Sequence, residues 1–108
     1  MHHELRIYEI FPETRDAFHA RFRDHALRLF QRHGFTSLAL WETEIDGKPR
    51  FVYLLAWPDD AMREAAWKAL LADPEWIEIK RRTAAEHGTL VGATDGWVLR
   101  GLDYGPAL

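Results

Sequence analysis

The stretch Phe51–Trp57 reads FVYLLAW and is apolar on both faces of an extended chain. It is too short for a buried helix and rich in aromatic and β-branched residues, which favour strands. A strand in a sheet with one face in water alternates apolar and polar residues, whereas a strand apolar on both sides has both faces covered. Because helices can cover only one of these faces, we expect a second copy of the chain to cover the other.

The pattern before this strand predicts a strand and a long helix. Alternation over Glu4–Phe11 predicts the strand, which Pro12 ends. Apolar residues at spacings of three and four then predict the helix, with Thr14 or Asp16 as its N-cap and Gly34 as its stop. Its expected inward side comprises Phe18, Phe22, His25, Ala26, Leu29, Phe30 and His33.

A second strand is predicted over Phe35–Ile45, and Asp46–Gly47 is a strong hairpin signal before the third strand. The length of the hairpin loop decides which residues share a face of the sheet. An even-numbered loop places Trp41 on the face of Val52, and an odd-numbered loop places it on the face of Tyr53. The sequence leaves both arrangements open.

Two shorter helices and a last strand follow. Asp59 is the predicted N-cap of the first helix, and Asp73–Pro74 supplies the N-cap and first position of the second, which ends near Gly88. The last strand is predicted over Gly96–Asp103. The expected inward residues are Met62, Ala65, Ala66, Ala69 and Leu70 in the first helix and Trp76, Ile79 and Thr83 in the second.

The predicted order is strand, helix, strand, strand, two helices, strand. It is the split βαβ pattern of an α+β, ferredoxin-like domain with a four-stranded antiparallel sheet. At 108 residues the chain is one domain, residues 1–108, without internal repeats. In this fold the helices lie on one face of the sheet, so the other face is bare unless a partner covers it.

Composition excludes several classes of protein. The formal net charge is -3 and the Arg residues are scattered among Asp and Glu, so we expect no nucleic-acid partner. The lack of Cys excludes disulfides, thiolate metal sites and cysteine nucleophiles. No apolar stretch approaches the roughly 18 residues of a membrane helix, and the strand-like pattern starts too early for a signal peptide. We therefore expect a cytoplasmic protein with no membrane partner.

Four stretches carry a family resemblance: Glu4–Tyr8, Trp41–Ile45, Arg63–Trp67 and above all Leu70–Trp76. With the closing strand Val98–Arg100 and the following Asp103–Pro106, they resemble the NIPSNAP family, a branch of the dimeric α+β barrel superfamily. Gly101 stands where a proline is common in the family. The resemblance implies a homodimer whose two sheets face each other, with the helices outside. Related branches include cofactor-free monooxygenases, haem-degrading enzymes, isomerases and dehalogenases.

The candidate site lies between the helices and the sheet. His25 is the candidate general acid or base, because histidine titrates near neutral pH; the alternative is a core-edge histidine bonded to backbone. Arg63 and Arg100 can bind an anion if they point inward, and otherwise pair with a carboxylate. Aromatic residues supply the walls of an apolar ligand site or simply fill the core and dimer interface. The candidate ligand-binding residues are Tyr8, Phe22, Trp41, Tyr53, Arg63, Trp67, Trp76 and Arg100.

No cofactor and no metal are expected, since the sequence has no phosphate-binding glycine loop, no dinucleotide fingerprint and no metal-ligand constellation. His2 and His3 are expected to be a frayed terminus. Three hypotheses remain. The first is a homodimeric barrel that binds a small, mostly apolar molecule. The second is a cofactor-free monooxygenase or isomerase acting on an aromatic or polyketide-like substrate, and the third is a non-catalytic interaction module.

Overall fold

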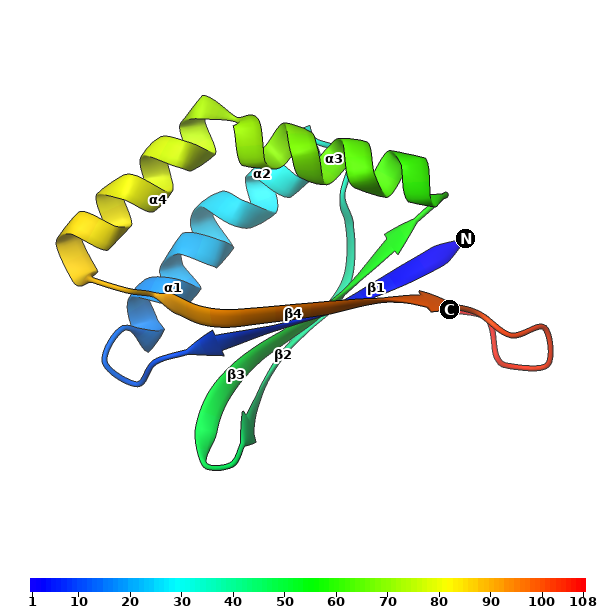
Figure 1. The fold of residues 1–108 in the computed structure, drawn as a ribbon, viewed down its shortest axis with the longest axis horizontal. Coiled ribbons are helices and arrows are strands. Elements are labelled where there is room, and N and C mark those ends of the chain that lie inside the picture. Colours follow the sequence, from blue (N-terminus) through cyan, green and yellow to red (C-terminus); the bar gives the residue numbers. More distant parts are fainter.

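A four-stranded antiparallel sheet with helices on one face makes up the chain in a computed structural model, which describes residues 1–108 (Figure 1). The sheet has the strand order β2-β3-β1-β4. This order, with a helical crossover in each half, confirms the predicted α+β ferredoxin-like fold. The strands are β1 (His2–Ile10), β2 (Thr36–Ile45), β3 (Lys48–Trp57) and β4 (Val91–Arg100).

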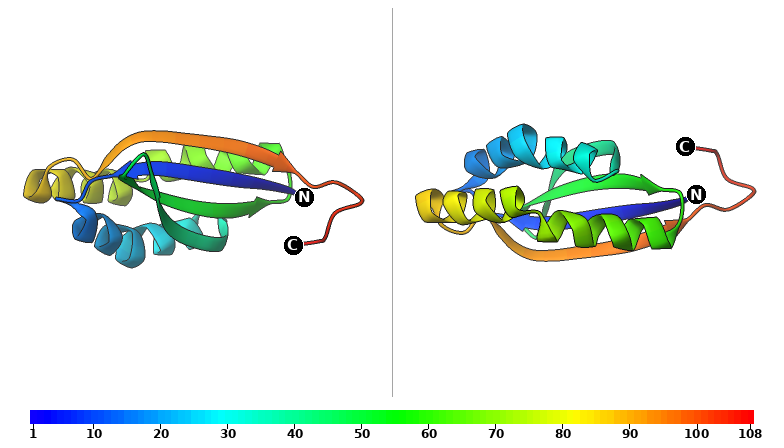
Figure 2. Two further views of the ribbon diagram at one scale, coloured as in Figure 1. Left: turned by 90° about the horizontal axis from the view of Figure 1, so that it is seen from below. Right: turned by 90° about the horizontal axis from the view of Figure 1, so that it is seen from above.

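The helices form a single layer on the sheet. Seen from below, the sheet faces the viewer, and seen from above, the helices do (Figure 2). No helix is long and apolar enough to cross a membrane. The first crossover consists of α1 (Arg15–Arg21), the π-helical segment η1 (Phe22–Ala26) and α2 (Leu27–Arg32), and the second of α3 (Asp60–Ala72) and α4 (Pro74–His87).

Local signals in the sequence correctly set the hairpin turn and the start of α3, whereas Thr14 occupies the N-cap position of α1 without a side-chain capping bond. Asp46 and Gly47 both have positive φ, 55° and 74°, as the predicted two-residue hairpin turn requires. The loop is therefore even-numbered, and Trp41 lies opposite Val52. The side chain of Asp59 accepts a hydrogen bond from the backbone N–H of Met62 at 2.8 Å, so its predicted role as an N-cap is confirmed.

The terminal strands differ from the prediction. β1 begins at His2, which lies opposite Trp57 and Arg100, so the first histidines are paired strand residues rather than a frayed end. β4 spans Val91–Arg100 rather than Gly96–Asp103, because its backbone pairs with β1 along its whole length. Ladder hydrogen bonds to a central strand thus override the turn-like composition of residues 92–96.

The core lies between the helix layer and the sheet, and the inward side of α3 is rotated relative to the prediction. Met62, Ala65 and Ala69 are exposed, whereas Arg63 and Trp67 turn toward the sheet. Both of these inward residues approach a buried carboxylate on β1, which alanine spacing alone does not reveal. The largest fully buried side chains are Ile10, Phe18, Leu29, Tyr53, Leu55, Trp57 and Leu70.

Candidate ligand-binding site

A cavity of about 280 Å³ lies between the helices and the face of the sheet that they cover. Aromatic and aliphatic side chains from β1 and all the helical segments make up most of its wall. A cavity of this size is at the lower end of the range of small-molecule sites, roughly 300–1,000 Å³. The main apolar lining residues are Tyr8, Phe22, Phe30, Trp67, Leu70 and Trp76.

A buried carboxylate on β1 ties the cavity wall together. Glu4 is 3% exposed, and its Oε1 accepts hydrogen bonds from the indole N–H groups of Trp57 at 3.0 Å and Trp67 at 2.9 Å. Its Oε2 lies 3.6 Å from Nη1 of Arg6 and 3.9 Å from Nη1 of Arg63. Glu4 therefore fixes the orientation of the Trp67 ring, which forms one wall of the cavity.

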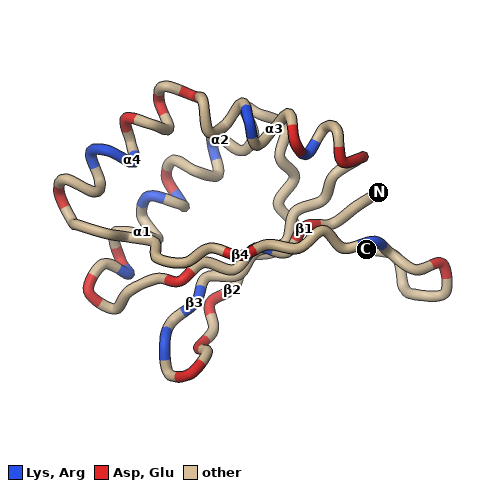
Figure 3. The backbone as a smooth tube through the Cα atoms, viewed as in Figure 1, with Lys and Arg blue, Asp and Glu red and all other residues tan.

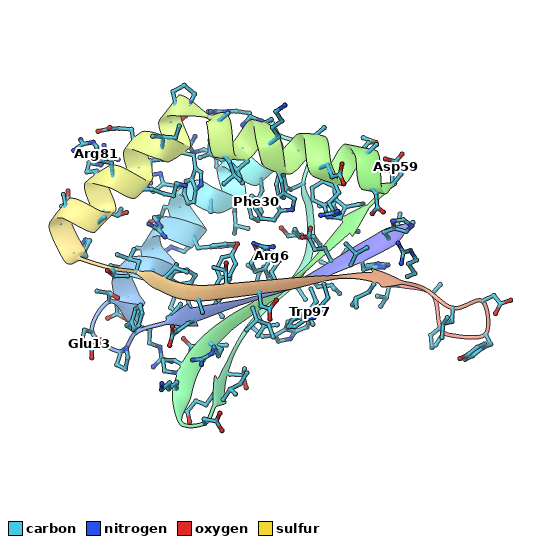
Figure 4. All side chains as sticks on the ribbon, viewed as in Figure 1. Arg6, Glu13, Phe30, Asp59, Arg81 and Trp97 are labelled. Atoms are coloured by element: carbon cyan, nitrogen blue, oxygen red, sulfur yellow. The ribbon has the colours of Figure 1, made fainter.

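Arg6 brings a positive charge into the cavity. Its guanidinium carbon lies 4.7 Å from the ring centroid of Trp67 and 5.5 Å from that of Tyr8. Figure 4 shows Arg6 and Phe30 in the space between the sheet and the helix layer. Burial by itself lowers the pKa of Arg6, but the phenols of Tyr8 and Tyr53 raise it by more. The pKa therefore lies above its ordinary value, and the guanidinium stays charged.

Two tyrosine hydroxyls meet beside Arg6. The hydroxyls of Tyr8 and Tyr53 are 2.5 Å apart and hydrogen-bonded to each other. Tyr53 is fully buried, whereas Tyr8 is half-buried and lines the cavity. Burial raises the pKa of Tyr53 well above that of an ordinary phenol, so its hydroxyl keeps its proton at every physiological pH. The pair therefore offers a fixed hydroxyl at the cavity wall.

Two further cations lie at the ring of Trp76. The Arg21 guanidinium carbon is 5.5 Å and the Lys80 ammonium 5.7 Å from the ring centroid. Arg21 also donates a hydrogen bond to the hydroxyl of Thr83 at 3.1 Å. Arg21, Trp76 and Lys80 all line the cavity. The predicted inward side of α4, which includes Trp76 and Thr83, is confirmed.

Half of the predicted ligand-binding residues line this cavity, namely Tyr8, Phe22, Trp67 and Trp76. Tyr53 lies behind Tyr8. Trp41 is 50% exposed and lies opposite Val52 rather than toward the helices. Arg63 approaches Glu4, and Arg100 is exposed, 3.9 Å from Asp60. Both arginines thus pair with carboxylates, which was the alternative left open by the sequence.

The structure does not bring His25 into the cavity. Its Nδ1 lies 3.4 Å from Nη2 of Arg28 on the exposed side of the same helix. The expected projection of His25 toward the sheet is wrong because the helix is not a regular α-helix there. The wider π-turn Phe22–Ala26 advances each residue by a smaller rotation, so it keeps Phe22 and Ala26 inward and turns His25 aside.

His33 and Asp73 form a second polar cluster, away from the cavity. The carboxylate of Asp73 caps α4 by accepting from the backbone N–H of Glu75, and it also accepts from Nη1 of Arg32 and Nε2 of His33. The hydrogen bond with His33, at 2.7 Å, is the main reason why the pKa of Asp73 falls to about 2. The cluster joins the end of α2 to the start of α4, so its role is structural.

Neither a metal cluster nor a patch of one charge is present. No group of three His, Cys, Asp or Glu residues is placed to hold a metal ion. Figure 3 shows Lys and Arg interspersed with Asp and Glu along the helices.

The sequence model of the NIPSNAP family matches residues 3–100. The chain belongs to the NIPSNAP family. Its fold matches a NIPSNAP-like domain protein from Burkholderia xenovorans, with a TM-score of 0.80 and 23% identity over 99% of this chain and 90% of that one. A NIPSNAP family protein from Agrobacterium tumefaciens gives a TM-score of 0.81 at 16% identity, over 97% of this chain and 96% of that one.

The fold also extends beyond the NIPSNAP family. A crystal structure of an antibiotic biosynthesis monooxygenase matches with a TM-score of 0.60 and 16% identity, over 94% of this chain and 99% of that one. At these identities the likeness shows the fold alone. No curated protein is significantly similar in sequence to the chain. The function of this NIPSNAP chain must therefore be argued from its own site.

Sequence reasoning missed the charged residues of the site, Arg6, Arg21 and Lys80. A usable signal exists for Arg6. The alternation Glu4, Arg6, Tyr8 places three polar residues on one face of a strand, and the topology makes that strand central and covered by helices. Polar residues on a covered face need partners, so this pattern marks a polar site inside the fold. Arg21 and Lys80 carry no such signal, because both occur in charged helical segments.

Proposed function

We propose that the protein is a homodimer that binds a small, mostly apolar molecule in the cavity between its helices and its sheet. The observation that carries the proposal is the cavity itself, with apolar walls and the polar groups of Arg6 and Tyr8 beside them. Protein interiors are close-packed and rarely keep voids larger than a water molecule. The pocket departs from this close packing, and an apolar occupant would supply the contacts that its walls lack.

The open face of the sheet supports the homodimer. Trp41 and Trp97 on this face are 50% and 46% exposed, and Figure 4 shows Trp97 on the side of the sheet away from Phe30. Contiguous exposed apolar surface of this kind is typical of an interface. A second copy of the chain presents the same surface and can cover it by two-fold symmetry. The open apolar face consists of Leu5, Ile7, Trp41, Val52, Leu54, Trp97 and Leu99.

Ligand binding is tested by calorimetric titration with naphthaleneethanol, a neutral apolar probe. We expect saturable binding to the wild type. Thr94 is an exposed residue at the cavity wall, so Thr94→Trp fills the cavity without removing any core packing. This variant should lose binding. Ala69→Trp adds the same side chain to an exposed position of α3 outside the cavity and should bind as the wild type does.

The result that contradicts the proposal is no binding to the wild type, or equal binding to both variants. In the first case the interaction module, which needs no ligand, becomes the better account. In the second case the probe binds at some other surface. Circular dichroism and thermal unfolding of the two variants show that each is folded.

A cofactor-free enzyme acting on an aromatic or polyketide-like substrate is the second candidate. The observation that favours it is the Tyr8–Tyr53 hydroxyl pair at the cavity wall, next to the charge of Arg6. These groups can hydrogen-bond a substrate oxygen and stabilise negative charge that develops on it. Oxygen uptake with a hydroquinone-type substrate tests the monooxygenase form. Uptake should be present in the wild type and reduced in Tyr8→Phe; no uptake above that of buffer contradicts it.

A further inference from the structure

Every charged residue that lines the cavity is positive. These residues are Arg6 on β1, Arg21 on α1 and Lys80 on α4, and no Asp or Glu is part of the wall. Guanidinium and ammonium groups keep their charge at neutral pH. An apolar cavity with three cations differs from an ordinary core, in which buried charges are paired.

Arg6 is only partly compensated. The nearest carboxylate, Glu4, approaches Arg6 at 3.6 Å and is shared with Arg63 at 3.9 Å, both too long for a hydrogen bond. The other oxygen of Glu4 is already occupied by the two indole N–H groups. The Nε atom of Arg6 is buried and has no hydrogen-bond partner at all. The charge of Arg6 beside the cavity is therefore only partly compensated by a carboxylate.

Arg21 has no carboxylate partner, in contrast to two other arginines of the same crossover. Arg23 pairs with Asp24 at 2.9 Å, and Arg28 with Glu75 at 2.6 Å. Arg21 makes one hydrogen bond, to a hydroxyl. Burial lowers the pKa of Arg21, an effect opposed by Tyr8, so the charge is held there at a cost. Lys80 beside it also makes no ion pair.

We infer that the cavity is built for an amphipathic organic anion, whose carboxylate lies against Arg21 and Arg6 and whose apolar part lies among the aromatic walls. The inference rests on the proposed function, since it concerns the same cavity. A carboxylate accepts two parallel hydrogen bonds from a guanidinium group, and Arg21 makes only one hydrogen bond within the chain. A wholly apolar ligand would remove water from Arg21 without replacing its hydrogen bonds, and such desolvation opposes binding.

The test compares two probes of the same ring system, naphthaleneacetate and naphthaleneethanol, by calorimetric titration at low salt. In the wild type the acid should bind about tenfold more tightly than the alcohol, as expected for charge-assisted hydrogen bonds. In Arg21→Met the preference should disappear while the affinity for the alcohol is kept. Raising the salt concentration should weaken binding of the acid alone.

Arg81→Met is the matched control. Arg81 lies on α4 and pairs with Glu78 at 2.6 Å outside the cavity, so this variant should keep the preference for the acid. Lys80→Met is a second test of the same charge cluster if Arg21→Met is unstable, because Lys80 makes no ion pair that its removal would break. It should lower the affinity for the acid and spare the alcohol.

The outcomes separate the inference from the proposed function. If the wild type binds the alcohol as tightly as the acid, or if both variants keep the preference, the cavity binds ligands but does not select anions. The inference is then overturned while the proposed function stands. If neither probe binds, the proposed function fails and the inference fails with it.

Discussion

The two faces of strand β1 have polarities opposite to those that their surroundings suggest, whereas the covered face of its neighbour β3 is apolar as expected. The face under the helices carries Glu4, Arg6 and Tyr8 along its central strand, whereas the face without a covering layer carries Leu5 and Ile7 in the same strand. In an ordinary monomer with one solvated face, the polar residues of an antiparallel strand point to water. The proposed second copy of the chain would account for this reversal, because it would cover the open face.

The polar groups of the covered face and the apolar residues of the open face are stabilised in different ways. On the covered face the polar groups are satisfied internally: the indoles bond to Glu4, and the tyrosine hydroxyls bond to each other. Arg6, whose charge is only partly compensated by Glu4, lines the cavity. The open face has no comparable internal solution, because apolar side chains in water gain only from contact with another surface. The covered face thus fits a ligand and the open face a second copy of the chain.

The largest effect is expected on the covered face. Glu4→Ala leaves two indole donors unpaired and removes the carboxylate nearest to Arg6 and Arg63. It should lower the free energy of unfolding by about 3 kcal/mol, measured by urea denaturation. Glu4→Gln retains an oxygen acceptor for the indoles and should cost less. Equal, small effects of both changes would show that the buried polar cluster does not hold this face together.

A charge on the open face should act on assembly rather than on folding of the single chain. Leu54 lies on the open face of the central strand β3, opposite Leu5. Leu54→Asp should weaken the dimer by at least roughly 2 kcal/mol, which is about a thirtyfold change in the dissociation constant. Sedimentation equilibrium measures this constant. Met62→Asp, at an exposed position of α3, should leave it unchanged; a wild type that is already monomeric contradicts the account of this face.

The Tyr8–Tyr53 pair allows the stability contributed by a buried hydroxyl to be compared with that contributed by a hydroxyl at the cavity. Tyr8→Phe leaves the buried hydroxyl of Tyr53 without a partner and should destabilise the fold by about 1–2 kcal/mol. Tyr53→Phe leaves only the hydroxyl of Tyr8, which lines the cavity, and should cost less. Thermal unfolding of the two variants compares these costs. The opposite ranking would mean that the hydroxyl of Tyr53 has another partner.

Asp73 lies outside both faces of the sheet, so its expected effect is on acid unfolding rather than on ligand binding or assembly. Its pKa is about 2 in the folded chain, against an ordinary value of 3.8. A lowered carboxyl pKa stabilises the fold above the ordinary value, and this stability is lost as the pH falls from about 4 toward 2. Asp73→Asn keeps a capping side chain and should flatten the loss of stability over this range. Glu86→Gln, on the exposed side of α4, should unfold with acid as the wild type does.

Features fixed by a few neighbouring residues could be predicted from the sequence. Asp46–Gly47, Gly34 and Asp73–Pro74 each impose a local backbone conformation or supply a cap, and all appear where expected. Features fixed by distant contacts could not. The inward side of α3 follows the buried Glu4 rather than its alanines, and the bounds of β4 follow pairing with β1.

The residues of the candidate site also divide into those that the sequence could predict and those that depend on distant contacts. Trp67 and Trp76 were predicted as aromatic walls, but only Trp76 lies on the inward side that the helical spacing predicts, because the inward side of α3 is rotated. His25 was misplaced because a π-turn leaves no clear mark on an apolar pattern. Arg21 could not be singled out either. Its lack of a carboxylate partner is a property of three-dimensional neighbours, and its sequence surroundings are as charged as those of Arg23.

The most direct test of the two-face account uses the indole N–H signals of the five Trp residues as reporters in one nitrogen-labelled sample. Naphthaleneacetate should shift the signals of Trp67 and Trp76, which line the cavity, and spare Trp41 and Trp97 on the open face. Leu54→Asp should shift the signals of Trp41 and Trp97 and spare those of Trp67 and Trp76. Shifts of Trp41 and Trp97 on ligand addition, or no change in them in Leu54→Asp, would contradict the assignment of a ligand to one face and a partner to the other.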